Sequence, residues 1–493
     1  MAFQKLFILT QFHFKYFDND QLIYWTMVKD YSQGIIHEPF FYGQDYNFPL
    51  EAWAAVPGYW LGLPPHILLP IVTLFFATFP FLIILYSLYK KEQYASAVLV
   101  LLGLCTLSLK YDLMTGIPRG FVQGLFLASL ALPLLNRINY LKTFCISLLL
   151  ALAFVFNPNS LFLSVCILFI VWFKNKSNLR IIHFGILLTG VALAYGVNWQ
   201  WNHFYDINPS HNLHHKDPLY YHFSDLTRLG ELDALWTGLS PFIWDFALIN
   251  VFIFTAFIVY FFKHKKRALG IFTCFIFIFL LASVALSKCA DGSHSFLFPY
   301  ARFYLSIPII YSLLLWLNND SSVQAPRLKP RLLFLIPLLG LGYTIYKTTT
   351  LNAYVQKQLQ IDAGVQCMKV EALKIKCESI QYKMRENHVN LLVNADRDDK
   401  IAYGCPCLWN NDSFVTFNPE YERRTWRLET ESKLLRKRFM LVFWDDYQVT
   451  RIDSTCQPLN NYLFLIQNPG LPAADWLKNK GYAIRPLSIG KAK

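Results

Sequence analysis

The chain has 493 residues, of which 55% are hydrophobic and only 16% are charged. Soluble globular proteins carry about 25% charged residues, so this composition argues against an ordinary soluble protein. The net charge of +13 does not predict a nucleic-acid partner, because the one dense block of basic residues, 263–267, lies between two apolar segments.

Eleven apolar segments predict helices that cross a membrane. Runs such as 66–89 and 181–199 contain no Asp, Glu, Lys or Arg, and their length covers the ~30 Å of a hydrocarbon core. These runs lack strict alternation with period two, so helices are favoured over a β-barrel. The predicted spans are 2–17 (short for a span), 66–89, 94–109, 117–135, 140–156, 160–173, 181–198, 247–262, 268–287, 298–317 and 332–349.

The loops between these spans differ in charge. Every second loop is basic, and together these loops hold 14 lysines and arginines in 37 residues, against 7 in the 126 residues of the other loops. Basic loops stay in the cytoplasm, so the sequence predicts that the first long loop, 18–65, the loop 199–246 and the C-terminus face the other side. The predicted location is the inner membrane of the cell, in the cell envelope, with multi-pass topology.

The character of the sequence changes after about residue 350. Short β-type runs occur at 389–395, 439–444 and 462–467, and a helix is predicted at 351–387. We therefore predict two domains, a transmembrane domain at 1–350 and an extracytoplasmic α/β domain at 351–493. Five of the ten cysteines lie in the second domain, so one or two disulfides are expected there. The sequence does not predict which cysteines pair.

Polar residues of the first loop follow one another in a distinctive order. Asp18 and Asp20 come directly after the first apolar segment, then His37-Glu38-Pro39, then the run 42–47, then Leu50-Glu51-Ala52 before the next span. This order resembles the first extracytoplasmic loop of the GT-C glycosyltransferases, the superfamily of protein O-mannosyltransferases and lipid A aminoarabinose transferases. The resemblance implies a mainly α, polytopic bundle of GT-C type and a sugar donor carried on a polyprenyl phosphate.

The same resemblance implies roles for charged residues. An acid in the first loop serves the acceptor, which makes Asp18 or Asp20 the candidate base; the alternative is that both are ordinary solvated acids at a helix end. Arg119 and Arg302 lie at the far-side starts of two spans, where each could bind the donor phosphate bidentately or merely extend to the membrane surface.

Other polar residues are candidates for the pocket or for a metal. Glu38, Asp45 and Tyr46 are expected either to line the acceptor pocket or to cap loop structure. Asp112 could bind Mg²⁺ or Mn²⁺ together with Asp18 or Asp20, or it could pair with Lys110. No cofactor is required by the sequence.

The loop 199–246 is rich in aromatic residues and histidine. Aromatic faces stack on sugars, yet tryptophan and tyrosine also gather at membrane interfaces, so both readings stay open. The run 211–215 contains three histidines that could hold a metal.

The leading hypothesis is a membrane glycosyltransferase that transfers a hexose or pentose from a polyprenyl-phosphate donor to a lipid, glycan or protein acceptor on the extracytoplasmic face. The alternative is a membrane transporter or lipid flippase. A transporter places its charges near the bilayer midplane and often has repeated halves. Here the acids cluster in loops on one side and no repeat is visible, which favours an enzyme.

Overall fold

The computed structural model is mostly helical. It describes residues 1–135, 138–175, 180–211, 213, 222–223, 226–241, 246–318, 330–361, 367–395, 400–409, 414–419, 422–424, 438–442, 456–467 and 471–481.

Contacts within the chain group its residues into two units. Residues 1–13, 70–199 and 217–366 form the first unit, and residues 14–69, 200–216 and 367–493 form the second. These boundaries differ from the sequence-based division at residue 350. The first long loop belongs to the same unit as the C-terminal region, because the two segments pack against each other, as described below.

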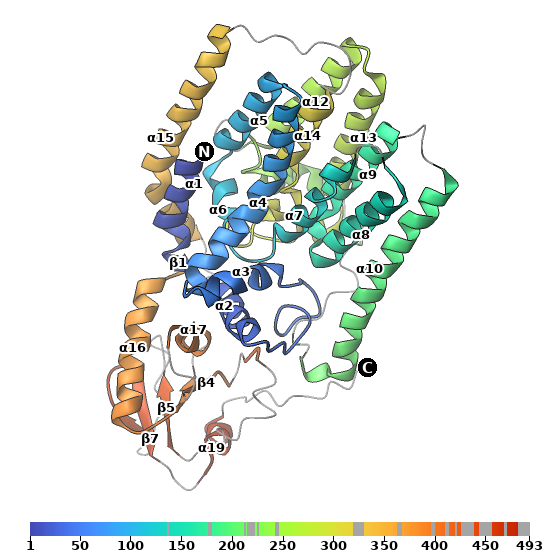
Figure 1. Cartoon of the computed structure of the whole chain (residues 1–493). Coiled ribbons are helices and arrows are strands. Elements are labelled where there is room, and N and C mark those ends of the chain that lie inside the picture. Colours follow the sequence, from blue (N-terminus) through green and yellow to red (C-terminus); the bar gives the residue numbers. More distant parts are fainter. Residues whose placement is uncertain are drawn as a thin grey trace. The chain divides into compact units, whose positions relative to one another are not determined.

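The first unit consists of helices. Among the described residues, four stretches are long and apolar enough to cross a membrane: Pro65–Lys90, Pro158–Asn175, Ile181–Ile207 and Tyr300–Asn318. Shorter apolar helices accompany them, and α12 packs against α13 and α14 against α5 (Figure 1). The elements are α1 (Ala2–Ile8), η1 (Leu9–His13), α4 (Pro65–Lys90), α5 (Tyr94–Thr106), α6 (Leu109–Met114), α7 (Gln123–Ser129), η2 (Leu132–Leu135), α8 (Tyr140–Phe156), η3 (Pro158–Ser160), α9 (Leu161–Asn175), α10 (Ile181–Ile207), η5 (Leu226–Glu231), α11 (Leu232–Trp236), α12 (Ala247–Lys263), α13 (Arg267–Ser283), η6 (Ser287–Ala290), η7 (Tyr300–Tyr304), α14 (Ile307–Asn318) and α15 (Pro330–Ile361).

Polar residues interrupt the apolar helices at defined points. The Asn139 side chain accepts a hydrogen bond from the backbone N–H of Lys142 at 2.9 Å and so caps the start of α8. Asn157 ends that helix and starts η3, where its side chain accepts from the backbone N–H of Asn159. Asparagine caps stabilise helix starts because they satisfy backbone groups that have no partner within the helix.

The second unit combines helices with strands. Its elements are β1 (Tyr16–Phe17), α2 (Asn19–Ser32), α3 (Leu50–Trp60), η4 (Pro209–His211), β2 (Met368–Lys369), α16 (Val370–Glu386), β3 (Leu391–Asn394), α17 (Lys400–Leu408), β4 (Val415–Phe417), β5 (Arg438–Val442), β6 (Cys456–Pro458), β7 (Leu463–Gln467) and α19 (Ala473–Asn479).

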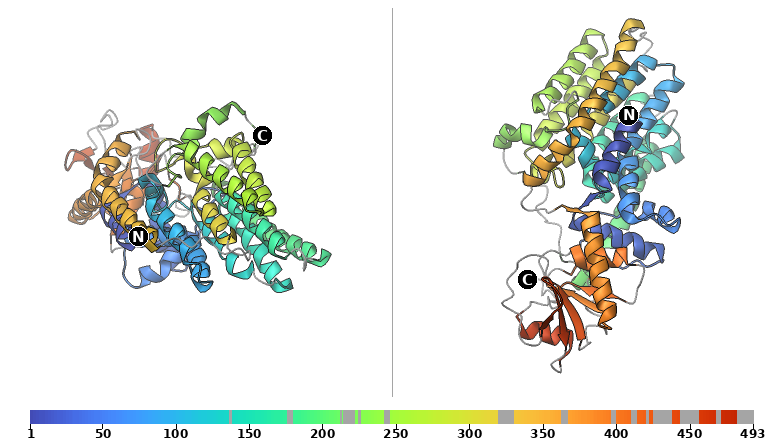
Figure 2. Two further views of the ribbon diagram at one scale, coloured as in Figure 1. Left: turned by 90° about the horizontal axis from the view of Figure 1, so that it is seen from above. Right: turned by 90° about the vertical axis from the view of Figure 1, so that its left-hand side faces the viewer.

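Five of these strands form one mixed sheet in the order β4-β3-β5-β7-β6. Strand β3 is parallel to β4 and β5, whereas β7 is antiparallel to β5 and β6. Strands β3 and β7 form within two of the runs that the sequence predicts, and β5 overlaps the third run, 439–444, but begins one residue earlier, at Arg438. The right-hand view of Figure 2 shows α16 alongside the strands, and Trp476 and Leu477 of α19 join the apolar core of the sheet.

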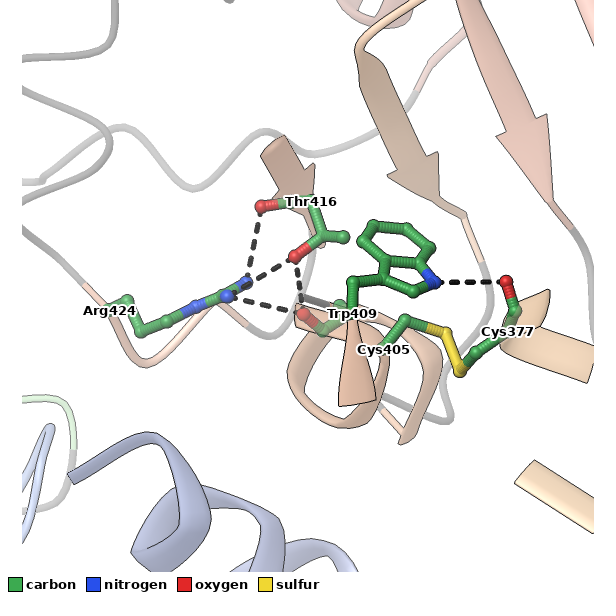
Figure 3. Close-up of a disulfide and its surroundings, with 6 residues drawn as sticks. Cys377, Cys405, Trp409, Thr416 and Arg424 are labelled. Carbon is green, nitrogen blue, oxygen red and sulfur yellow. Dashed lines mark hydrogen bonds between the residues drawn. A yellow bond between two sulfur atoms is a disulfide. The ribbon is translucent and has the colours of Figure 1, made fainter. Parts of the chain in front are cut away.

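A disulfide joins two helices of this unit. Cys377 of α16 bonds to Cys405 of α17, and the Trp409 side chain donates a hydrogen bond of 2.9 Å to the Cys377 carbonyl (Figure 3). The cross-link closes a loop of 28 residues. By restricting the unfolded chain, a loop of that size stabilises the fold by about 3–4 kcal/mol in the chain-entropy model.

The first long loop packs directly on this C-terminal fold. Strand β1 pairs antiparallel with β2, so that Tyr16 lies opposite Lys369 and Phe17 opposite Met368. Helix α2 packs against α17, where the Lys29 ammonium donates to the Pro406 carbonyl at 3.2 Å. A Cβ atom at Gly404 of α17 would lie 2.5 Å from the Leu373 side chain of α16 and 3.3 Å from the Leu22 side chain of α2, so the glycine allows α17 to pack closely against both helices.

Candidate functional site

Asp18 lies at the junction of β1 and α2. Its side chain accepts a hydrogen bond of 3.0 Å from the backbone N–H of Gln21 and so caps the N-terminus of α2. The residue is fully buried. A carboxylate at this position gains from the positive end of the helix dipole, so the fold holds Asp18 in one orientation.

Asp20 lies in the first turn of the same helix and forms an ion pair with an arginine from the C-terminal region. The Arg423 guanidinium donates to Asp20 Oδ1 at 3.3 Å, and both side chains are partly exposed. The Arg423 backbone N–H donates to the Tyr403 hydroxyl of α17 at 2.6 Å. Tyr403 thus fixes the backbone of Arg423 next to Asp20.

Arg424, the next residue, anchors this segment to the sheet. Its buried guanidinium donates to Glu422 Oε2 at 2.8 Å and to the Ala402 carbonyl at 3.2 Å. Further hydrogen bonds reach the Thr416 hydroxyl and carbonyl of β4 at 3.3 Å each (Figure 3). Because every one of these acceptors lies in the second unit, the fold of this unit determines where Arg423 meets Asp20.

Glu38 ties two distant segments of the second unit together. Its carboxylate accepts from the Gly43 backbone N–H at 2.8 Å and from the Tyr205 hydroxyl at 3.4 Å, while His211 Nδ1 lies 3.3 Å from its other oxygen. Gly43 has φ of 78°, a conformation that glycine adopts without strain. Glu38 therefore holds the turn 38–43 against the end of α10 and η4.

The pKa of Glu38 differs from that of an exposed glutamate. Burial raises it above its ordinary value of 4.5, and the hydrogen bonds from His211 and Gly43 oppose this rise without cancelling it. The folded protein thus holds this proton more tightly than the unfolded chain. Stability from this group is therefore present below pH 4.5 and lost as the pH rises through the raised pKa.

We expect Glu38→Gln to remove this pH dependence. Glutamine keeps an acceptor for the Gly43 N–H, so the variant should gain stability relative to the native protein as the pH rises above 4.5, by at most about 1.4 kcal/mol per pH unit. Thermal unfolding of the full chain in detergent, measured for the native protein and for Glu38→Gln at several pH values above 4.5, gives the difference in stability. Parallel curves would show that Glu38 does not titrate in this way.

Asp45 and Tyr46 lie half-buried in the turns that follow. The aromatic residues at the end of α10 pack on this same loop. Trp201 stacks on Phe48 with ring centroids 4.8 Å apart, and Tyr205 stacks on Phe40 at 6.1 Å. These two rings therefore hold the loop in place, a packing role that the sequence did not suggest. His214 and His215 lie outside the described residues.

Arg119 lies in the first unit, in the turn between α6 and α7, and is almost completely buried. Two asparagines from the segment after α8 hold the backbone that follows Arg119. The Asn157 side chain donates to the Gly120 carbonyl at 2.8 Å, and the Asn159 side chain donates to the Phe121 carbonyl at 3.2 Å. Gly120 has φ of 74°, which lets the chain turn sharply there. Two asparagines thus determine the backbone next to this cation.

Arg302 lies in η7 of the same unit. Its guanidinium donates to Asp291 Oδ2 at 2.6 Å and to the Pro299 carbonyl at 3.1 Å, and it lies 3.8 Å from the centroid of the Phe298 ring. The side chain is buried, whereas that of Asp291 is 43% exposed. Element η7 packs against η3, so Arg119 and Arg302 lie on segments that both contact this one turn.

Asp112 is buried between two lysines of the first unit. One of its oxygens bonds to Lys5 of α1, and the other accepts from Lys347 of α15 at 2.8 Å. Burial raises the pKa of Asp112, but the Lys347 and Lys5 ammonium groups outweigh burial and hold it below its ordinary value. Both partners are far away in sequence, and the expected pair of Asp112 with Lys110 stays a prediction.

This environment differs from that of a metal ligand. Both Asp112 oxygens already bind ammonium groups, and no group of three His, Cys, Asp or Glu residues within the described ranges is placed to hold a metal ion. We therefore derive no chemical step through Mg²⁺ or Mn²⁺.

The candidate residues divide between the two units. Asp18, Asp20, Glu38, Asp45 and Tyr46 belong to the second unit, whereas Arg119, Arg302 and Asp112 belong to the first. Sequence reasoning missed Arg423. The signal available for it was weak, a Glu-Arg-Arg triplet at 422–424 in a region with no recognisable motif.

Comparison with known proteins gives one informative likeness. No protein-family model and no curated protein sequence matches the chain. The crystal structure of ArnT from Cupriavidus metallidurans bound to undecaprenyl phosphate has a similar fold, with a TM-score of 0.55 and 10% sequence identity over 95% of this chain and 98% of that one. This likeness shows that the chain shares the fold of that protein, and together with the apolar helices it indicates an integral membrane protein.

Proposed function

We propose that this protein is a membrane glycosyltransferase that transfers a sugar from a polyprenyl-phosphate donor to a lipid, glycan or protein acceptor on the extracytoplasmic face. The observation that carries the proposal is the likeness in fold, over nearly the whole chain, to a protein whose crystal structure contains undecaprenyl phosphate. The acids at the start of α2 and the buried residues Arg119 and Arg302 are the two kinds of charge that such a transfer needs.

The proposal includes a topology. About eleven spans cross the inner membrane, and the C-terminal α/β domain lies outside the cytoplasm together with the first loop. The asymmetry of basic residues between alternate loops supports this orientation. The pairing of β1 with β2 and the packing of α2 on α17 also support it, because both keep the first loop and the C-terminal region on one side.

The chemistry follows from the residue types. An acceptor hydroxyl or amine attacks the anomeric carbon of the sugar, and the bond from that carbon to the phosphate oxygen breaks, with its electrons passing to the polyprenyl phosphate. The acceptor proton moves to Asp18 or Asp20, which is placed by the start of α2. Arg423 orients the Asp20 carboxylate through their 3.3 Å ion pair.

The leaving phosphate carries negative charge that fixed cations stabilise. Arg119 and Arg302 fill this role because both are buried and because an arginine can donate two parallel hydrogen bonds to a phosphate. Arg302 already pairs with Asp291. The phosphate would therefore either share the Arg302 guanidinium with the Asp291 carboxylate or displace that carboxylate.

Arg302→Lys tests the phosphate role. Lysine keeps the charge but loses the planar two-point contact, so we expect kcat/KM for a labelled polyprenyl-phosphate sugar to fall about tenfold to a hundredfold. Asp291→Asn is the matched control, since it removes the partner and keeps the arginine. If both variants impair transfer equally, Arg302 serves only to pair with Asp291.

The transporter alternative predicts a different result with the same purified chain. In vesicles, a transferase releases polyprenyl phosphate and labels an acceptor, whereas a transporter moves a solute across the bilayer without breaking the glycosyl bond. Solute movement without donor turnover would overturn the proposal.

A further inference from the structure

A hollow of about 290 Å³ lies in the second unit, where the end of α17 packs against one face of α16. Its lining from α16 consists of Lys374, Glu378, Gln381 and Arg385, which follow one another at intervals of four, three and four residues. Side chains at these intervals share one face of a helix. Pockets for small ligands measure roughly 300–1,000 Å³, so the hollow lies at the lower limit of that range.

The floor of the hollow is buried. Cys377 and Trp409 line it, and both residues are buried. The disulfide from Cys377 to Cys405 joins α16 to α17, and the Trp409 side chain donates to the Cys377 carbonyl at 2.9 Å (Figure 3). A ligand would therefore meet a floor that a covalent cross-link and a hydrogen bond already hold in place, which lowers the entropy cost of binding.

The rim of the hollow is polar and accessible. Lys374, Glu378 and Arg385 are exposed, and Gln381 is half-buried. Ammonium and guanidinium groups only donate hydrogen bonds, a carboxylate only accepts them, and an amide does both. The rim therefore offers donors and acceptors next to one another along one helix face.

This mixture of groups discriminates between classes of ligand. Glu378 lies one turn after Lys374 and two turns before Arg385, so an isolated anion or cation would meet a like charge as well as an opposite one. Uncharged hydroxyl groups both donate and accept, so they can pair with every side chain of the rim. Leu408 adds an apolar wall beside Trp409. A ligand that combines hydroxyls with apolar C–H faces matches both parts, and sugars have this chemistry.

We propose that the hollow binds a sugar unit of a glycan acceptor. That the glycan is the acceptor rests on the proposed transferase function, whereas sugar binding itself does not. The lining residues differ from the candidate transferase residues, and all of them belong to α16 or to the end of α17 and the residue after it. The hollow would therefore select the acceptor without taking part in the transfer of the sugar.

A glycan array of bacterial cell-envelope oligosaccharides tests the binding. The labelled full chain is applied in a detergent whose headgroup is not a sugar, because a glucoside or maltoside would compete for the hollow. The native protein is expected to retain neutral glycans, and Glu378→Ala/Gln381→Ala should lower the affinity at least about tenfold, since it removes two hydrogen-bonding groups of the rim. Glu371→Ala/Glu386→Ala is the matched control, because it removes two exposed side chains of the same helix outside the lining.

The salt dependence of retention separates sugars from ions. Binding of neutral hydroxyl groups should not change as the salt concentration rises, because there is no ligand charge to screen. If the array retains only glycans that carry phosphate or carboxylate groups, and salt abolishes their retention, the hollow is an anion site and the proposal is wrong. Equal retention of all glycans by the native protein and by Glu378→Ala/Gln381→Ala, with the variant eluting as a folded protein, would also overturn it.

Transfer to a retained glycan tests its role as acceptor. Glu378→Ala/Gln381→Ala should act mainly on KM for that acceptor, raising it about tenfold, because the hollow lies outside the reacting centre. An unchanged KM in a variant that has lost retention would show that the bound sugar is not part of the acceptor. Retention by a native chain that transfers no sugar would instead contradict the proposed function and leave the binding site standing.

Discussion

At least one of the variants Asp18→Asn and Asp20→Asn is expected to reduce sugar transfer by about a hundredfold or more, because a positioned carboxylate that accepts the acceptor proton contributes about 10²–10⁴-fold to the rate. Asparagine caps a helix as well as aspartate does, so Asp18→Asn should keep the hydrogen bond to the Gln21 N–H and leave α2 intact. Asp18→Asn therefore removes the negative charge of the carboxylate without removing the helix cap. Turnover of a labelled donor by the purified chain measures the loss.

The two variants differ in what else they remove. Asp20→Asn also breaks the ion pair with Arg423, which is partly exposed and therefore contributes less than about 1 kcal/mol to stability. Asp206→Asn, at an exposed position near the end of α10, is the matched control and should leave transfer unchanged. If both Asp18→Asn and Asp20→Asn remain fully active, neither carboxylate is the base and the proposed mechanism fails.

The sequence predicted the helical, membrane-type fold because burial in lipid requires long apolar runs that local composition reveals directly. It also predicted strands at β3, β5 and β7. The sequence predicts a membrane span at 181–198 and a loop from residue 199, whereas α10 continues to Ile207. Trp201 and Tyr205 lie in this last part of the helix and pack on Phe48 and Phe40.

Long-range pairs were beyond sequence reasoning. Asp112 is more than a hundred residues away from both Lys5 and Lys347, and no local sequence pattern predicts that these side chains form ion pairs. The same holds for Asp20 with Arg423 and for Glu38 with His211. Local chemistry could identify Asp18 and Asp20 as candidates, but their neighbours depend on how the first loop packs against the C-terminal fold.

Asp112→Asn is expected to be the most destabilising single substitution among these residues. It leaves the Lys5 and Lys347 ammonium groups buried beside each other without a counter-charge, and removing one partner of a buried ion pair costs about 3–5 kcal/mol. Because these lysines come from α1 and α15, the loss should loosen the packing of both helices around α6. The midpoint of thermal unfolding of the full chain in detergent measures the effect.

The cluster holds two positive charges and one negative charge, so its members should not be equivalent. Lys347→Met removes one of the two like charges and leaves Lys5 and Asp112 as a neutral pair, which should cost clearly less than Asp112→Asn. Glu386→Gln breaks an exposed ion pair with Lys383 and sets the scale for a surface pair, which contributes about 0–1 kcal/mol. Equal losses for Asp112→Asn and Lys347→Met would mean that packing, and not the balance of charge, determines the stability of this cluster.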